Sequence, residues 1–203
     1  MKRLLGAAMA AAMLAGTPVR AAEPAPEPPP PMLMTARDSL VAEFASVMFP
    51  LLQLDERMRP QLARVMIEAA RANPQEVSPA YLPFAEEAAA EVVDEMWGEL
   101  LDYIAHAITK DMTEAELSAG IALLRSDVGR IVMTAAVEDR EPVVTDAQRE
   151  AARQWMADPA MQGFLAKLRR IRENMAGIGE RFGPPMTKRF IARLKQKAGR
   201  SAA

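Results

Sequence analysis

From Thr35 onward, apolar residues recur at spacings of three and four, which is the spacing of one face of an α-helix. The chain shows no sustained alternation of apolar and polar residues and no Asn-Gly or Asp-Gly turn, so β-hairpins are not expected. Ala, Leu, Met, Glu and Arg dominate, and these are strong helix formers. We therefore predict an all-α fold, a compact bundle of about six to eight helices. The first two apolar stripes are Leu40, Phe44, Val47, Met48 and Leu51, and then Met58, Leu62, Val65, Met66 and Ala69.

The N-terminus has the pattern of a secretory signal peptide. A short basic start is followed by 13 mostly apolar residues, Leu4 to Gly16, and by small residues at Val19 and Ala21. A run of this length is shorter than the roughly 20 residues that span a bilayer. We predict a signal peptide over residues 1–21, cleaved after Ala21, and export to the periplasm. The chain has no Cys, so a lipid anchor and disulfides are not expected.

Composition divides the remaining chain into a spacer and one domain. Residues 22–34 are rich in Pro and predict an extended, semi-rigid spacer. Residues 35–203 predict a single helical domain with basic C-terminal helices, long enough to bury a core. Cleavage removes Lys2, Arg3 and Arg20, which leaves 22 basic against 27 acidic residues and a formal net charge of −5.

The longest predicted helix follows Ser78. Ser is a good N-cap and Pro79 suits the first helical position. We expect this helix to run to about Lys110. Its apolar stripe is Tyr81, Phe84, Ala88, Val92, Met96, Leu100, Ile104 and Ile108.

A corner between two short helices is predicted next. Thr113 and Glu116 have the spacing of a capping box, in which each side chain accepts a hydrogen bond from the other residue's backbone N–H. Leu117 begins the buried face, and Ser126 is a second N-cap. Gly129, one turn further on, has no side chain and allows another helix to come close.

The corner recurs once, which makes a weakly repeated helix-corner-helix unit. Thr145 with Gln148 repeats the capping box, and Asp158 before Pro159 repeats the second cap. In both copies the second cap follows its threonine by 13 positions, from Thr113 to Ser126 and from Thr145 to Asp158. The repeat rests on cap spacing and apolar phase, and chance similarity between two helix pairs is the alternative.

These residues resemble an exported bacterial family of helical proteins catalogued as domain of unknown function 2059. The family carries a Thr-x-x-Glu-Leu start, an apolar run and then Ser-Pro-x-Gly-Arg/Lys. The matching residues here are Thr113, Glu116, Leu117, Leu123, Ser126, Gly129 and Arg130. The family's Pro is Asp127 in this chain, and the core motif covers about residues 95–140. The resemblance implies an all-helical periplasmic protein and provides no catalytic residues.

His106 is the only histidine, so few catalytic or metal sites can be built. Glu99, Asp102 and His106 share a helical face and could approach one metal ion. Di-metal bundles need a Glu-x-x-His motif on each of two helices, which one histidine cannot provide. We predict a solvated His106, no metal, no cofactor and no catalytic residue.

Charge is distributed very unevenly along the chain. Glu87, Glu91, Glu95 and Glu99 recur every four positions and form one acidic helical stripe, which is either solvated or a docking face for a basic helix. Residues 167–203 carry 11 basic residues against two acidic ones, a net charge of +9.

Two helices are predicted in the basic C-terminal region. An apolar stripe runs to Phe182, and the Gly-Pro-Pro at 183–185 is expected to end that helix. A final short amphipathic helix is expected from Met186. Either it lies on an anionic membrane surface with its apolar residues dipping below the headgroups, or its apolar residues complete the core while its cations face water or the acidic stripe. We favour the core. The residues concerned are Lys188, Arg189, Phe190, Arg193, Leu194, Lys195 and Lys197.

The sequence thus predicts a non-enzymatic periplasmic protein, a protein-interaction or structural module. Its partner would be another protein or a second copy of itself. The alternative is binding of anionic lipid or a hydrophobic ligand through the basic amphipathic C-terminal region. The export signal argues against a nucleic-acid partner.

Overall fold

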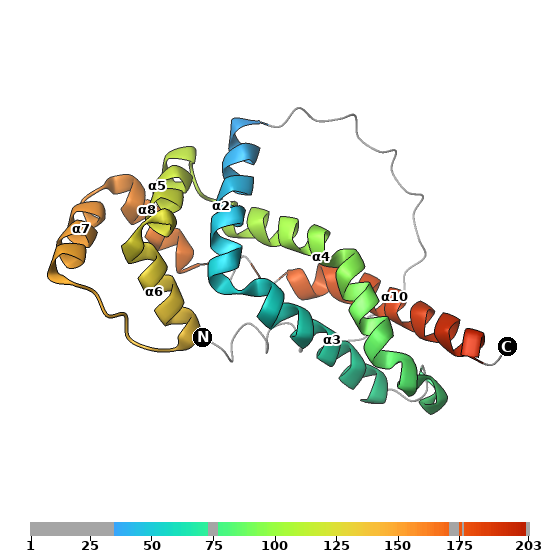
Figure 1. Ribbon diagram of the computed structural model, residues 1–203. Coiled ribbons are helices and arrows are strands. Elements are labelled where there is room, and N and C mark those ends of the chain that lie inside the picture. Colours follow the sequence, from blue (N-terminus) through green and yellow to red (C-terminus); the bar gives the residue numbers. More distant parts are fainter. Residues whose placement is uncertain (1–34, 73–76, 171–174, 176, 202–203) are drawn as a thin grey trace.

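The fold was obtained as a computed structural model, which describes residues 35–72, 77–170, 175 and 177–201 (Figure 1). The predicted signal peptide and Pro-rich spacer lie outside the described residues. Within them, eight α-helices and one short 3-10 helix pack together and there is no strand, which confirms the all-α prediction. No helix in this part of the chain is both long enough and apolar enough to cross a membrane.

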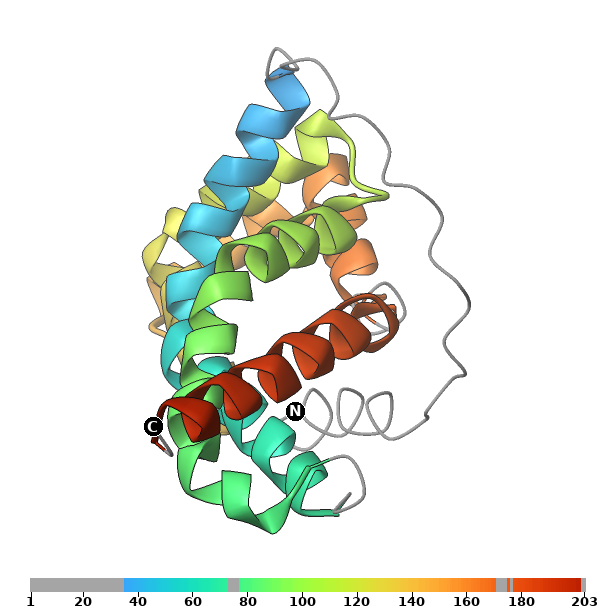
Figure 2. The ribbon, with the colours of Figure 1, turned by 90° about the vertical axis from the view of Figure 1, so that its right-hand side faces the viewer.

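Helix α4 is the central helix of a group that also contains α2, α3 and α10. It packs along α3 and α10 and also contacts α2, while α5, α6, α7 and α8 gather at the other end (Figures 1 and 2). The elements are α2 (Ala36–Leu52), α3 (Leu54–Ala72), η1 (Pro79–Phe84), α4 (Ala85–Thr109), α5 (Glu114–Arg125), α6 (Asp127–Glu138), α7 (Asp146–Met156), α8 (Pro159–Leu168) and α10 (Ile178–Ser201).

Arg37 fixes the start of α2 against the end of α4. Its guanidinium donates hydrogen bonds to the carbonyl oxygens of Met112 at 2.6 Å, Thr109 at 2.8 Å and Lys110 at 3.3 Å. A cation here satisfies carbonyls that the helix cannot pair itself and also offsets the negative end of the helix dipole. The contact therefore joins the first helix of the domain to the end of the longest one.

The helix predicted after Ser78 starts as a 3-10 turn and becomes α-helical only at Ala85. Ser78 does cap the first turn, since its hydroxyl accepts the amide of Ala80. Pro83 lies within the turn and has no backbone N–H to donate, which interrupts an α-helical ladder at this point. The helix then runs to Thr109, one residue before the predicted end.

The C-terminal region departs from the sequence prediction. Gly183–Pro185 does not end a helix, because α10 continues from Ile178 through both prolines to Ser201. A proline inside a helix costs about 3 kcal/mol, since it removes a hydrogen bond and crowds the preceding turn. Each fully buried large apolar side chain contributes about 1.5–3 kcal/mol. Five such side chains at spacings of four lie along this helix and are at most 2% exposed, which outweighs the two prolines: Ile178, Phe182, Met186, Phe190 and Leu194.

Candidate functional site

The predicted corner between α5 and α6 begins with a complete capping box. The amide of Thr113 donates to the Glu116 carboxylate at 2.6 Å, and the amide of Glu116 donates to the Thr113 hydroxyl at 3.2 Å. Leu117, the next residue, is fully buried. This part of the motif therefore starts α5 and directs its apolar face into the core.

Ser126 ends α5 and begins α6 with one side chain. Its hydroxyl donates to the carbonyl oxygen of Leu123 at 2.6 Å and accepts the amide of Gly129 at 2.9 Å. Arg130 is exposed and pairs with Asp127 at 2.6 Å. The corner is thus closed by contacts within eight residues, Leu123 to Arg130.

Gly129 allows another helix to come close, as predicted, and that helix is α5. A Cβ at this position would lie 1.8 Å from the carbonyl oxygen of Leu123 and 3.2 Å from the Cα of Leu124. The space is therefore taken by the last turn of α5, not by a separate helix passing by. The helix that comes close is thus the one on the other side of the corner, because the corner is tight.

Glu116 also joins α5 to α8. Its carboxylate accepts a hydrogen bond from the ammonium of Lys167 at 2.5 Å, and only 12% of its side chain is exposed. The Lys167 hydrogen bond, and then that of the Thr113 amide, hold the pKa of Glu116 below its usual value, against a smaller opposing effect of burial. Two glycines allow the close approach, since a Cβ at Gly163 would meet Glu116 at 2.2 Å and one at Gly120 would meet the Phe164 ring at 2.3 Å.

The second helix-corner-helix unit has the same caps. Thr145 and Gln148 form a complete capping box, and the Asp158 carboxylate accepts the amide of Ala160 at 2.8 Å. Its first helix is nevertheless packed differently. Helix α5 packs on α2 and α8 and buries Leu117, Gly120, Ile121 and Leu124, whereas α7 has no buried residue and makes its main contact with α8.

Three large apolar side chains in this part of the chain are exposed. We call Val132 on α6, Val143 in the connection and Met156 at the end of α7 the α6–α7 face. They are 42%, 81% and 50% exposed, and they are the only large apolar side chains that are exposed in the part of the chain that the structure describes. Although the two helices flank one connection, they make little contact with each other (Figure 1).

The arginines around this face are paired locally, whereas Asp139 and Glu141 in the connection have no ion pair among the described residues. Every basic residue between Asp127 and Met156 is an arginine that pairs with an acid two or three positions before it. The pairs are Arg130 with Asp127, Arg140 with Glu138, Arg149 with Asp146 and Arg153 with Glu150.

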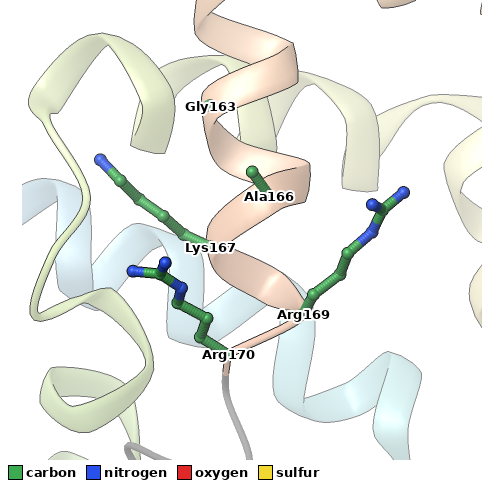
Figure 3. Close-up of a pocket in the computed structure, with 5 residues that line it drawn as sticks. All are labelled: Gly163, Ala166, Lys167, Arg169 and Arg170. Carbon is green, nitrogen blue, oxygen red and sulfur yellow. The ribbon is translucent and has the colours of Figure 1, made fainter.

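An open depression of about 460 Å³, lined mainly by the carbon atoms of its residues, lies at the C-terminal end of α8. It is lined by Gly163, Ala166, Lys167, Arg169 and Arg170 (Figure 3). The side chains of Lys167 and Arg170 project to one side of α8 and that of Arg169 to the other (Figure 3). The sequence analysis counted these cations but did not single out the pocket, whose only local signal is the Lys-x-Arg-Arg run at a helix end.

Three of the five predicted basic residues of α10, Arg189, Arg193 and Lys197, pair with α4. Phe190 and Leu194 are 2% and 0% exposed, so they belong to the core. Arg189 lies 3.0 Å from Glu95, and Arg193 lies 3.5 Å from the same carboxylate. Lys188 and Lys195 are exposed.

Lys197 makes the closest contacts with the acidic stripe. Its ammonium lies 2.7 Å from both Glu87 and Glu91. Hydrogen bonds with these two carboxylates raise the pKa of Lys197, and the bond from Lys197 lowers that of Glu91. Three of the four stripe glutamates thus pair with α10, and Glu99 is exposed.

His106 is exposed on α4. Its Nδ1 lies 2.8 Å from the carbonyl oxygen of Asp102, one turn earlier in the same helix. Among the described residues, no three His, Cys, Asp or Glu side chains are grouped so that they could hold a metal ion.

Comparisons of this chain with family models, with curated proteins and with solved structures give no match. The resemblance to domain of unknown function 2059 therefore remains a prediction from the motif residues.

Proposed function

We propose that this chain is a non-enzymatic exported module whose function is protein–protein contact, and that the α6–α7 face makes the contact. The observation that supports this most directly is the packing of α7. The helix has no buried residue, yet it carries a half-buried Trp155 and an exposed Met156. An isolated helix of 11 residues is marginal in water, so a helix of this kind gains from a partner that covers it.

The locally paired charges support the same proposal. Protein contact surfaces have cores depleted in unpaired charge and rims that are polar. On this face the arginines are already neutralised by neighbouring acids, so a partner can cover Val132 and Met156 without burying a lone cation. The signal-peptide pattern over residues 1–21 supports the periplasm as the compartment.

Photocrosslinking in the producing bacterium tests the proposal. Benzoylphenylalanine replaces Val132 or Met156, and in a matched control it replaces Thr187, which is exposed on α10. We expect discrete protein adducts from the first two positions and none from Thr187. Absence of adducts at both positions, with normal amounts of folded protein, would contradict a contact role for this face.

Export is tested separately on the same material. Amino-terminal sequencing of the mature protein should begin at Ala22. A protein that still begins at Met1 and stays inside the cells after osmotic shock would contradict export.

A second candidate function is binding of an anionic lipid through the basic C-terminal region. It is favoured by the pocket at the end of α8 and by the exposed Lys188 and Lys195. Each cation near an anionic bilayer contributes about 1 kcal/mol, and less at high salt. Phe190 and Leu194 are in the core, so such binding would be electrostatic and would not insert apolar residues.

Vesicle sedimentation at low salt tests the second candidate. The protein should pellet with vesicles of anionic lipid, remain in solution with neutral lipid, and lose binding when Arg169 and Arg170 are both changed to Ala. The matched control changes Arg149 and Arg153, two exposed arginines of α7, to Ala. Equal binding by the two double variants would exclude the pocket as the site.

A further inference from the structure

We propose that the partner of the α6–α7 face is a second copy of this chain, with α6 of one copy packed on α7 of the other and the reverse contact formed at the same time. The inference rests on the proposed function, because it requires that this face is a protein contact. Such a pair has twofold symmetry, which is the commonest arrangement of soluble homo-oligomers.

The repeated unit provides the first argument. Moving from one unit to the other shifts each position by 32, from Thr113 to Thr145 and from Ser126 to Asp158. The caps at all four positions are formed, so the two units match in local structure. With the same shift, Val132 of α6 corresponds to Phe164 of α8.

The chain makes one contact between its two units and leaves the matching one open. Phe164 of α8 is fully buried, and its ring lies directly on Gly120 of α5. The matching contact would place Val132 of α6 on Ala152 of α7. Within one chain this contact is absent, since α6 and α7 make little contact and Val132 is 42% exposed.

A similar comparison applies to Met156. Its counterpart in the first unit is Leu124, which is 3% exposed in the core, whereas Met156 is 50% exposed. The first helix of each unit therefore carries an apolar side chain at the same place, and only one of the two is covered. In the proposed pair, the partner's α6 covers Met156 and the partner's α7 covers Val132.

The charges favour a copy of the chain over a charged partner. A surface that meets itself across a twofold axis places like charges near each other, which costs free energy unless they are neutralised. The charged residues of α6 and α7 themselves are all paired locally, and the two acids without an ion pair among the described residues, Asp139 and Glu141, lie in the connection between the helices. Because only three large apolar side chains are exposed, we expect a weak dimer with a dissociation constant of about 10–100 μM.

Sedimentation velocity of the protein that begins at Ala22 tests the inference. From about 5 to about 500 μM, the weight-average mass should rise from that of one chain toward that of two, the range that a micromolar dimer requires. Val132→Glu and Met156→Lys should each keep the protein monomeric at the concentration where the wild type is half dimeric. Thr187→Glu on α10 is the control and should dimerise as the wild type does. Circular dichroism checks that each variant is folded, which is expected because Val132 and Met156 are exposed.

Mixing the two variants tests the proposed geometry. In an equimolar mixture, the introduced carboxylate of one chain faces the introduced ammonium of the other, so dimers should reappear. A wild type that stays monomeric at every concentration, variants that dimerise unchanged, or a mixture that stays monomeric would each overturn the inference. Adducts from Val132 or Met156 to a different protein, with a monomeric wild type, would overturn self-association and leave the proposed function standing.

Discussion

Replacing Gly129 with Ala should destabilise the domain strongly, although the change adds one methyl group. The new Cβ would lie 1.8 Å from the carbonyl oxygen of Leu123 and 2.6 Å from its carbonyl carbon. These are backbone atoms, so no change of rotamer relieves the clash. Helix α6 must move away from α5, and the Ser126 cap must open, because its hydroxyl contacts both Leu123 and Gly129.

The magnitude follows from these two effects. Loss of a serine cap costs about 1 kcal/mol. Overpacking that forces a backbone shift costs about 1–3 kcal/mol. Together they give about 2–4 kcal/mol for Gly129→Ala, which for a domain of this size lowers Tm by roughly 4–16 °C.

Gly98→Ala is the matched control. Gly98 lies in the exposed part of α4, and a Cβ there would have no atom within 4 Å. The same chemical change should therefore stabilise the protein by about 0.5–1 kcal/mol, since Ala is the better helix former. Urea unfolding followed by circular dichroism measures both variants. A Gly129→Ala midpoint at or above the wild-type value would refute the account of the corner.

Further predictions concern the same contacts. Ser126→Ala should cost about 1 kcal/mol in the same urea assay, and an unchanged midpoint would show that the cap does not stabilise the corner. Glu116→Gln should keep the capping box, as Gln148 does in the second unit, but should lose the ion pair with Lys167. The folded pKa of Glu116 lies below the ordinary value of 4.5. The difference in stability between wild type and variant at pH 7 should therefore shrink as the pH falls below about 4.5, and disappear below the folded pKa. A difference from wild type that persists at the lowest pH would contradict this. Phe190→Ala should cost about 3–5 kcal/mol by thermal unfolding, because its ring is buried between α10 and the core; a small loss would instead suit an exposed, membrane-facing residue.

Much of the fold could be predicted from the sequence because it depends on residues close together in the chain. The capping boxes of Thr113 and Thr145 each join residues three positions apart, and both form as predicted. Ser126 likewise caps α6 through a contact with Gly129. Apolar spacing also identified the end of α4 to within one residue, because a helix must bury one face at that period, whereas the α-helix starts six residues later than predicted.

Other features depend on residues far apart in the chain, and only the tertiary structure decided them. The prolines at 184 and 185 usually end a helix, but burial of Phe182 and Met186 against the rest of the domain keeps α10 continuous. The candidate surface also depends on residues far apart in the chain. The sequence showed two similar units. Only packing determined that α5 is covered by α8, and that α6 and α7 leave Val132 and Met156 exposed. The reason is that the choice of which helices meet depends on the whole chain.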